Sequence, residues 1–496
     1  MTLDSSPARD LRARARQAML EAGFALDLPP AAAAEAAALD QSQIAAQATQ
    51  VRDLRGLLWS SIDNADSRDL DQVEFAEQLP SGEIRLLIGI ADVDAFVSAG
   101  SAIDRHAAAN ATSVYTGVVT FPMLPEHLST NLTSLIAGAD RLALVVEFVI
   151  GDPAAGSSQS DEPRAPDVYR ALVHNHAKLD YVTTGAWLEK SGNAPPELAA
   201  IPGLEAQLRL QDQAAEWLRA LRRRNGALDL ETIEAHLVAA DGVVLDLTVQ
   251  HKSRARYLIE SLMIAANSVM AAFLEDRGVP VIERVVRTPT RWPRIVELAA
   301  TFGEQLPTMP NVRALSDFME RRKQADPAHF PDLSLAVVKL LGAGEYTLVL
   351  PGQDDVSHFG LAAQDYTHAT APNRRYADLI TQRLLKATLA QLPAPYTNAE
   401  LAAIAELCNE RNSAAKKVER RMRKTASVAL MAGKIGATFD AIVTGAADKG
   451  TFVRLLAPPV EGRVVRGEQG LDVGDQTRVR LVATDAAKGF IDFERV

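Results

Sequence analysis

The chain has 496 residues, of which 47% are hydrophobic, and a single cysteine, Cys408. Its length predicts a globular protein of two to four domains, and one cysteine excludes an intramolecular disulfide and fits a reducing compartment. The net charge of −11 argues against a protein whose whole surface attracts nucleic acid. The N-terminus lacks the apolar core of a signal peptide, and no apolar run reaches about 18 residues, so we expect a cytoplasmic protein that does not enter a membrane.

Residues 1–50 are expected to form a small helical module. From residue 6 onward this segment is alanine-rich and helical in period, with breaks at Gly23, Pro29 and Pro30, which predicts two or three short helices. A helix-turn-helix module and a helical cap on the main domain both fit the pattern.

Residues 51–432 are expected to form one mixed α/β domain, because strand and helix patterns alternate along them. Strands are predicted at 84–97 and 143–150, and helices at 101–112, 205–224, 252–278 and 373–391.

Residues 433–496 predict a five-stranded barrel of the OB type, because short alternating strands are separated by Gly and Asp turns. Phe439, Phe452 and Phe490 are candidates for stacking on bases, although aromatic residues of so small a barrel often belong to its core.

The stretch "SSIDNADSRDLDQVEF", residues 60–75, gathers four aspartates around a single arginine. The repulsion between their negative charges can be offset by exposure to water, by paired cations or by a bound metal ion. The apolar run before it predicts a strand that carries the acids out of a core. Asp69 and Asp71 would point to one side, and a loop could return Asp63 to meet them. Their oxygens suit Mg²⁺, whereas a solvated acidic turn is the simpler alternative.

Basic residues cluster at 219–224 and at 416–424. Solvated helix faces usually explain such runs, but within an acidic protein they could also form a channel that attracts a polyanion.

The acidic stretch resembles the acidic motif of the ribonuclease II (RNB) family of processive 3′→5′ exoribonucleases. Further family motifs follow in order at similar spacing, namely "VYTGVVTFPMLPEHLS", "HNHAKLDY", "NGALDLE", "LIESLMIAAN", "YTHATAPNRRYADLITQRLL" and "VERRM". The resemblance covers roughly residues 55–496. It implies an α+β (mixed α/β) RNB catalytic domain over 51–432, followed by an RNA-binding OB-fold barrel over 433–496.

The resemblance also assigns roles to residues of the catalytic centre. It implies that Mg²⁺, or Mn²⁺ in its place, is held by Asp63, Asp69, Asp71 and Gln72. Arg374 would clamp the scissile phosphate and Arg375 would be a second donor. Glu419 would orient water or assist proton transfer, or else form a salt bridge on its helix surface.

RNA contacts are implied outside the metal site as well. Tyr115 aligns with the aromatic residue that stacks on the terminal base, and Tyr181 and Glu260 align with residues that contact ribose hydroxyls. Phe439 and Phe452 of the barrel complete the predicted RNA-binding set.

The chain departs from the family pattern at several positions. The acidic run of the family usually ends in two adjacent aspartates, and the second is Gln72 here, which can ligate a metal but adds no charge. Leu230 replaces an aromatic residue that some members use to sandwich bases, and "HATAPNRRY" stands for "HFTSPIRRY". Residues 1–50 are too short for the paired cold-shock domains of the family, so we expect an RNA entrance of different shape.

These observations predict a monomeric, Mg²⁺-dependent exoribonuclease that releases nucleoside 5′-monophosphates from the 3′ end of single-stranded RNA. Two alternatives stay open. One is a catalytically weakened protein that captures RNA ends on the same fold, and the other is a metal phosphohydrolase of short oligonucleotides.

Overall fold

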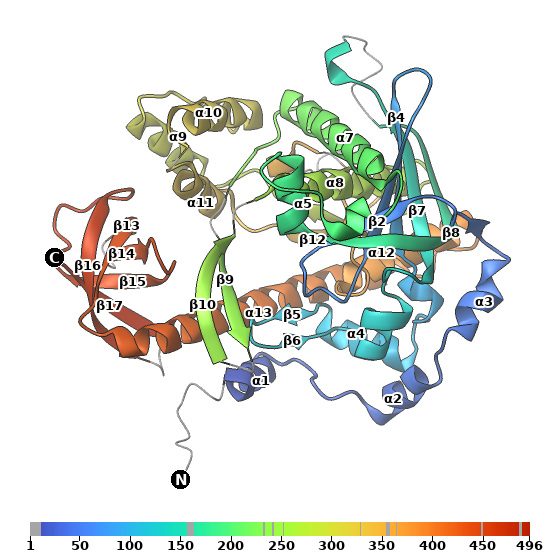
Figure 1. The fold of residues 1–496 in the computed structure, drawn as a ribbon, viewed down its shortest axis with the longest axis horizontal. Coiled ribbons are helices and arrows are strands. Elements are labelled where there is room, and N and C mark those ends of the chain that lie inside the picture. The colour runs from blue at the N-terminus through green and yellow to red at the C-terminus, as the bar shows by residue number, and fades with distance from the viewer. Residues whose placement is uncertain are drawn as a thin grey trace.

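The computed structural model describes residues 11–155, 163–231, 234–240, 243–250, 252–327, 329–353, 358–363, 365–447, 450–485 and 489–496. The first ten residues of the predicted helical module therefore lie outside the described part. A main body of sheet and helices forms most of the molecule, with N-terminal helices along one side and a C-terminal barrel standing apart at one end (Figure 1). The predicted mixed α+β class with a terminal barrel is confirmed.

A six-stranded sheet forms the centre of the main body. Its order is β1-β8-β2-β3-β4-β7, with an additional pairing of β8 to β7. The strands are β1 (Arg52–Asp53), β2 (Trp59–Asp63), β3 (Gln72–Gln78), β4 (Ile84–Ala91), β7 (Asp140–Ile150) and β8 (Arg164–Asp180). The long β8 pairs with β7 over its first part and with β2 over its last part, so the pairing closes into a ring. Most side chains of β4 and β7 are buried, because strands enclosed on both faces must be apolar throughout.

The predicted strand at 84–97 ends earlier than expected. β4 stops at Ala91 because Asp92 turns the chain, its carboxylate accepting a hydrogen bond from the Ala95 amide at 3.2 Å. This carboxylate is buried and paired with Arg170 and Lys386, each at 2.8 Å. The acid that broke the apolar pattern therefore ends the strand and ties the sheet to a helix.

Helices cover the sheet and carry several of the predicted site residues. They are α4 (Ala102–Asn110), α5 (Tyr181–Leu188), α6 (Pro196–Ala199), α7 (Leu204–Arg224), α8 (Arg254–Glu275), α12 (Tyr376–Leu389) and α13 (Asn398–Met431). α7 packs on α8 and β3, and α8 also contacts α5 and α12. By length and composition α8 could cross a membrane, but 67% of its apolar window is buried inside the protein, as in the core helix of a soluble protein.

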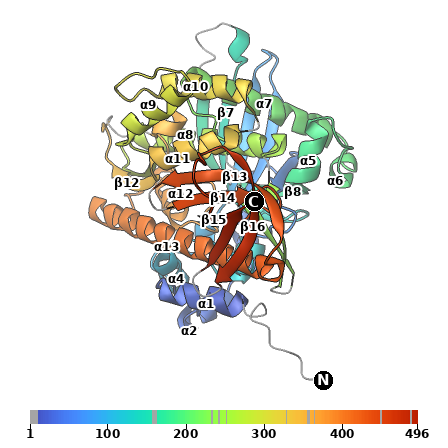
Figure 2. The ribbon, with the colours of Figure 1, turned by 90° about the vertical axis from the view of Figure 1, so that its left-hand side faces the viewer.

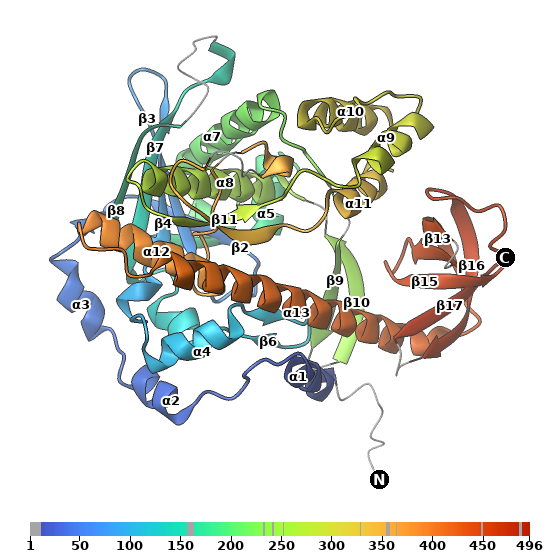
Figure 3. The same ribbon diagram turned by 180° about the vertical axis from the view of Figure 1, so that it is seen from behind.

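α13 links the main body to the barrel. A capping box between Thr397 and Glu400 starts this 34-residue helix. Seen from behind, it runs across the body and ends at the barrel (Figure 3). On the way it contacts α1, β5, β10 and β12, which are α1 (Leu11–Glu21), β5 (Val114–Tyr115), β10 (Val243–Gln250) and β12 (Glu345–Val349).

Smaller units surround this frame. β5 pairs with β6 (Thr120–Phe121), β10 with β9 (Glu234–Ala240), and β12 with β11 (Val281–Val285). The β9–β10 hairpin stands between the main body and the barrel (Figure 1). A separate apolar cluster holds together α9 (Trp292–Thr301), α10 (Val312–Ala325) and α11 (Phe330–Leu341).

The C-terminal barrel is closed in the order β13-β14-β15-β17-β16 and faces the viewer in Figure 2. Its strands are β13 (Thr438–Ala447), β14 (Gly450–Leu455), β15 (Glu461–Arg466), β16 (Gln476–Asp485) and β17 (Phe490–Arg495). Its core includes Phe493 and also takes in Val428 and Met431 from the last turns of α13. The barrel is therefore packed onto the end of that helix.

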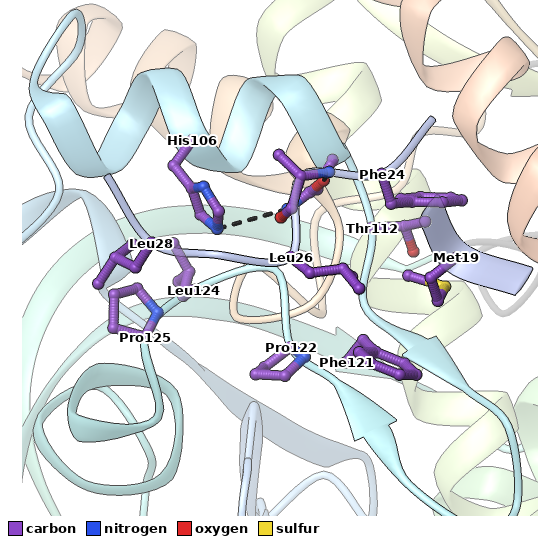
Figure 4. Close-up of a pocket in the computed structure, with 12 residues that line it drawn as sticks. Met19, Phe24, Leu26, Leu28, His106, Thr112, Phe121, Pro122, Leu124 and Pro125 are labelled. Atoms are coloured by element: carbon purple, nitrogen blue, oxygen red, sulfur yellow. Dashed lines mark hydrogen bonds between the residues drawn. The ribbon is translucent and has the colours of Figure 1, made fainter. Parts of the chain in front are cut away.

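The N-terminal segment contributes α1, α2 (Pro30–Ala37) and α3 (Ser42–Ala48), which pack on α13, α4 and β7 respectively. Between α1 and α2 the chain is held by Asn110, whose amide both donates to and accepts from the backbone of Ala25 at 2.9 Å. A cavity of about 120 Å³ lies under this segment (Figure 4), with Met19 and Phe24 on one side and Phe121 on the other. The N-terminal helices thus cover part of the main body.

Candidate active site

Seven of the predicted residues line one cavity of about 380 Å³ at the ends of β2 and β3. They are Asp63, Asp69, Asp71, Gln72, Tyr115, Tyr181 and Arg374. The far wall is formed by α8 through Arg256, Ile259 and Met263. Residues more than three hundred positions apart in the sequence therefore meet here, as the acidic motif and the "PNRRY" motif were predicted to do.

Asp63 is the last residue of β2 and is aligned in register with Asp180 at the end of β8. Burial raises the pKa of the Asp63 carboxyl to about 6, against the opposing charge of Lys178. Its Oδ1 accepts a hydrogen bond from the Gln72 amide at 3.4 Å. Its Oδ2 is buried and has no hydrogen-bond partner among the described residues.

The loop between β2 and β3 is fixed through its backbone. The Lys178 ammonium donates to the carbonyls of Ala65 and Ser67 at 2.8 and 2.6 Å. The Ser134 hydroxyl donates to the Arg68 carbonyl at 2.7 Å and accepts from the Leu70 amide at 2.9 Å. These contacts hold the backbone of the loop and do not involve the side chains of Asp69 and Asp71. The backbone therefore fixes where the two aspartates lie, and their side chains can turn into the cavity.

Asp71 is the most buried acid of the cavity, with an exposed fraction of 2%. Its carboxylate accepts hydrogen bonds from the Asn373 amide at 3.0 Å and from Arg374 Nε at 3.3 Å. Burial and the charge of Asp69 raise its pKa to about 7, and the guanidinium of Arg374 opposes that shift. The guanidinium of Arg374 is thus held beside Asp71 at the cavity.

Tyr115 connects two of the predicted catalytic acids. Its hydroxyl donates to Asp69 Oδ2 at 2.8 Å, and its backbone amide donates to Glu419 Oε1 at 3.2 Å. The side chain remains 40% exposed at the edge of the cavity. The ring is therefore held by its hydroxyl while part of its surface stays available for a ligand.

Arg256 belongs to this site and was not predicted from the sequence. Its guanidinium lies 4.5 Å from the centre of the Tyr181 ring, and it lines the same cavity. An arginine in the first turn of a helix opposes the helix dipole. That unfavourable position was the signal in the sequence that could have identified it.

Four residues predicted to bind RNA lie outside this cavity. The Arg375 guanidinium is paired with Asp378 at 2.6 Å, and its role as a second phosphate donor stays a prediction. Glu260 is paired with Lys252 at 3.0 Å and lines a second cavity of about 280 Å³, one helical turn along α8 from Arg256. In the barrel, Phe439 packs against the core and Phe452 is 42% exposed.

The acids share a cavity but do not converge on one point. Within the part of the chain that the structure describes, no group of three or more His, Cys, Asp or Glu side chains is close enough to hold a metal ion. The donor set nevertheless consists of carboxylate and amide oxygens, which suit a hard cation such as Mg²⁺. The unpartnered Oδ2 of Asp63 is a buried oxygen that such an ion would satisfy.

Comparison with known proteins finds two family matches. The model described as the RNB domain matches residues 51–391, and the model described as the RNase II-type exonuclease C-terminal S1 domain matches residues 437–496. Helix α13 lies entirely between the two matched ranges.

Among curated relatives, Ribonuclease R 1 of Lactococcus lactis is 28% identical over 476 residues, covering 89% of this chain and 56% of the relative. Ribonuclease R of Thermotoga maritima is 29% identical over 481 residues, covering 89% of this chain and 64% of the relative. This chain therefore spans less than two thirds of the length of either relative. A solved structure of Mycoplasma genitalium RNase R in complex with ribose methylated single-stranded RNA has a TM-score of 0.85 at 21% identity, covering 98% of this chain and 78% of that one.

Proposed function

The chain belongs to the RNB family, whose model matches more than half of it, and from that premise we propose that it is a processive 3′→5′ exoribonuclease. It would hydrolyse single-stranded RNA and release nucleoside 5′-monophosphates. The observation that carries the proposal is the single cavity in which Asp63, Asp69 and Asp71 meet Arg374 and Tyr115. The names of the ribonuclease relatives support it.

Asp63, Asp69, Asp71 and Gln72 would hold a Mg²⁺ ion. When bound, this ion supplies a water of lowered pKa and offsets negative charge on the scissile phosphate. The carboxyl groups of Asp63 and Asp71 have raised pKa values near neutrality. They must therefore lose their protons before they can bind the cation.

Arg374 would hold the phosphate through the part of its guanidinium fork that does not face Asp71. Its Nε is 3.3 Å from Asp71 Oδ2, which keeps the fork beside the acids. Glu419 lies on the other side of Tyr115 and would orient water or move a proton at its carboxylate. Tyr115, half-exposed, would stack on the terminal base, and Tyr181 with Arg256 would contact the adjoining nucleotide.

The strand would reach this cavity along basic surface. The second cavity beside α8 contains Arg219, Arg222, Arg223 and Lys252. These cations lie on α7 and just before α8. Asp229 and Glu260 of the same lining pair with Arg219, Arg223 and Lys252, so four cations stand against two acids at this concave surface. Such a local field attracts a polyanion, and binding should weaken steeply with salt.

The test is a time course on 5′-labelled single-stranded RNA, with Mg²⁺ or EDTA, for this protein and its Asp71→Asn variant. We expect a ladder that shortens from the 3′ end, requires the metal and disappears in the variant. Products of mixed length that begin inside the strand would contradict the exonuclease mechanism.

A second candidate, an RNA-capture protein, is favoured by the neutral side chain at Gln72, which lowers the charge available to a metal. The same time course separates the two. Tight RNA binding without shortening, in Mg²⁺ and in Mn²⁺, would identify capture.

A further inference from the structure

Three side chains from different parts of the chain hold the backbone that presents Arg374. They accept hydrogen bonds from alternate amides: Asn267 Oδ1 from Ala369 at 2.9 Å, Asp378 Oδ1 from Ala371 at 2.8 Å, and Asp71 Oδ1 from Asn373 at 3.0 Å. Asn267 lies on α8, Asp378 on α12, and Asp71 in the loop between β2 and β3. We refer to residues 369–375 as the arginine loop, which is thus tied to three separate elements.

The Arg374 side chain depends on this backbone for its position. The side chain is 44% exposed, so packing alone does not fix its guanidinium beside Asp71. The Ala371 carbonyl accepts hydrogen bonds from the amides of Arg374 and Arg375 at 3.2 and 3.0 Å. The Arg374 carbonyl accepts from the Ser113 amide at 3.0 Å. Where the arginine loop lies therefore decides where the guanidinium lies.

Asp378 has no part in the proposed mechanism, although it is the most enclosed of the three acceptors. Its exposed fraction is 0%, and it lies in the first turn of α12, where the helix dipole favours a negative charge. The Oδ1 that holds the Ala371 amide also accepts a hydrogen bond from Arg375 Nη2 at 2.6 Å. A buried carboxylate requires such a cation. Asp378 therefore joins the residues on both sides of Arg374 in the chain.

Asn267 holds the start of the arginine loop without a charge. It is 3% exposed. While its oxygen holds the Ala369 amide, its amide nitrogen donates to Thr370 Oγ1 at 3.4 Å. Because Thr370 lines the active-site cavity, this contact reaches the cavity wall itself.

We propose that Asp378 and Asn267 are positioning residues for Arg374: they hold the arginine loop so that the guanidinium stays beside Asp71, where the scissile phosphate would bind. The inference rests on the proposed function, because it concerns the phosphate contact of that same site. Misplacing a catalytic group by about 1 Å can lower a rate about a hundredfold. RNA affinity comes largely from phosphates along the whole strand. The two residues should therefore affect kcat much more than KM.

The experiment measures single-turnover cleavage of labelled RNA, with RNA affinity measured separately in EDTA. It compares the wild type, Asp378→Asn, Arg374→Lys and the double variant. Asp378→Asn removes the charge that pairs with Arg375, so the arginine loop should loosen. We expect the cleavage rate to fall at least about tenfold, with RNA affinity within about twofold of wild type. In the Arg374→Lys background the same change should cost less than about threefold, because a flexible ammonium does not depend on the orientation of a planar fork.

Asp92→Asn is the matched control. Asp92 is a buried carboxylate that also ties α12, through Lys386 at 2.8 Å, but its described partners lie outside the arginine loop. It should lower the melting temperature without lowering the cleavage rate of the folded protein. Asn267→Ser removes a neutral contact, so it tests the loop even if Asp378→Asn does not fold, and it should lower the cleavage rate about fivefold. An Asn267→Ser protein with the wild-type rate, or equal losses from Asp378→Asn in both backgrounds, would overturn the inference.

Hydrogen exchange of the loop amides separates this outcome from that of the proposed function. Asp378→Asn should speed exchange across residues 369–375, and Asp92→Asn should not. Unchanged exchange in Asp378→Asn would overturn the inference even where the wild type degrades RNA. Faster exchange, in a protein whose wild type does not degrade RNA, would refute the exonuclease and leave the hold of Asp378 on the arginine loop in place.

Discussion

Replacing Met19 by alanine should slow catalysis although Met19 is outside the active-site cavity. Met19 is 2% exposed on α1 and belongs to an apolar cluster with Val114, Val418 and Met422. Val114 precedes Tyr115, and Val418 precedes Glu419. The cluster therefore supports the two backbone segments that the hydrogen bond from the Tyr115 amide to Glu419 joins at 3.2 Å.

The magnitude follows from these contacts. Truncating a buried methionine costs about 2–5 kcal/mol of stability. A hydrogen bond to a charged group contributes about 1.5–3 kcal/mol, and about 1.4 kcal/mol corresponds to a tenfold change in rate. Loosening the cluster enough to lose most of the bond to Glu419 should thus lower kcat roughly tenfold, with a smaller change in KM.

The assay compares single-turnover cleavage of labelled RNA and thermal unfolding for Met19→Ala and Leu20→Ala. Leu20 is the matched control, because it is the next residue of α1 and is 49% exposed. We expect Leu20→Ala to behave as wild type in both measurements. A Met19→Ala protein that loses stability but keeps the kcat of the Leu20→Ala control would refute the supporting role of α1.

Three further predictions concern the cavity itself. Burial holds the pKa of Asp71 at about 7 in the folded metal-free protein, above its unfolded value. The protonated carboxyl therefore stabilises the fold fully in acid, and this contribution, on the order of 4 kcal/mol, is lost as pH rises through about 7. Asp71→Asn should flatten this fall of stability when thermal unfolding is measured against pH. Arg374→Lys keeps the charge but loses the planar fork, so kcat should fall about a hundredfold with little change in RNA affinity, and an unchanged kcat would exclude a phosphate clamp. Lys178→Met removes the positive charge that lowers the pKa of Asp63, so this pKa should rise further. The acid limb of the pH–rate profile should then move to higher pH. A profile that keeps its position would show that the protonation of Asp63 does not limit the rate.

Much of the candidate site was predictable because its residues lie in continuous motifs. The apolar strand and the spacing of Asp63, Asp69 and Asp71 predicted that these acids meet, whereas Arg374 was placed beside them only by the resemblance of its motif "PNRRY" to that of the family. The barrel was predictable for a similar reason, since alternation and Gly turns are local signals.

Other contacts are revealed only by the folded chain. The motif "RR" alone does not show which acid each arginine meets, and in the structure Arg374 pairs with Asp71 while Arg375 pairs with Asp378 three residues later. Glu260 shares α8 with Arg256, yet the two side chains leave the helix toward different cavities. Glu74 does not disturb the strand pattern of the residues around it. No local signal in the sequence therefore indicates that its carboxylate is buried without a hydrogen-bond partner among the described residues.

A single helix, α13, sets the distance between the barrel and the candidate active site. Glu419 lies in its second half, and Met431 at its last turn is part of the barrel core. Twelve residues of helix span about 18 Å. Because the same helix is packed by α1 near Glu419 and by the barrel at its end, the position of the barrel relative to Tyr115 is set by a rigid element rather than by a linker. An RNA strand bound to the barrel would then meet the cavity at a fixed distance, which suits an enzyme that removes nucleotides one after another from the same end.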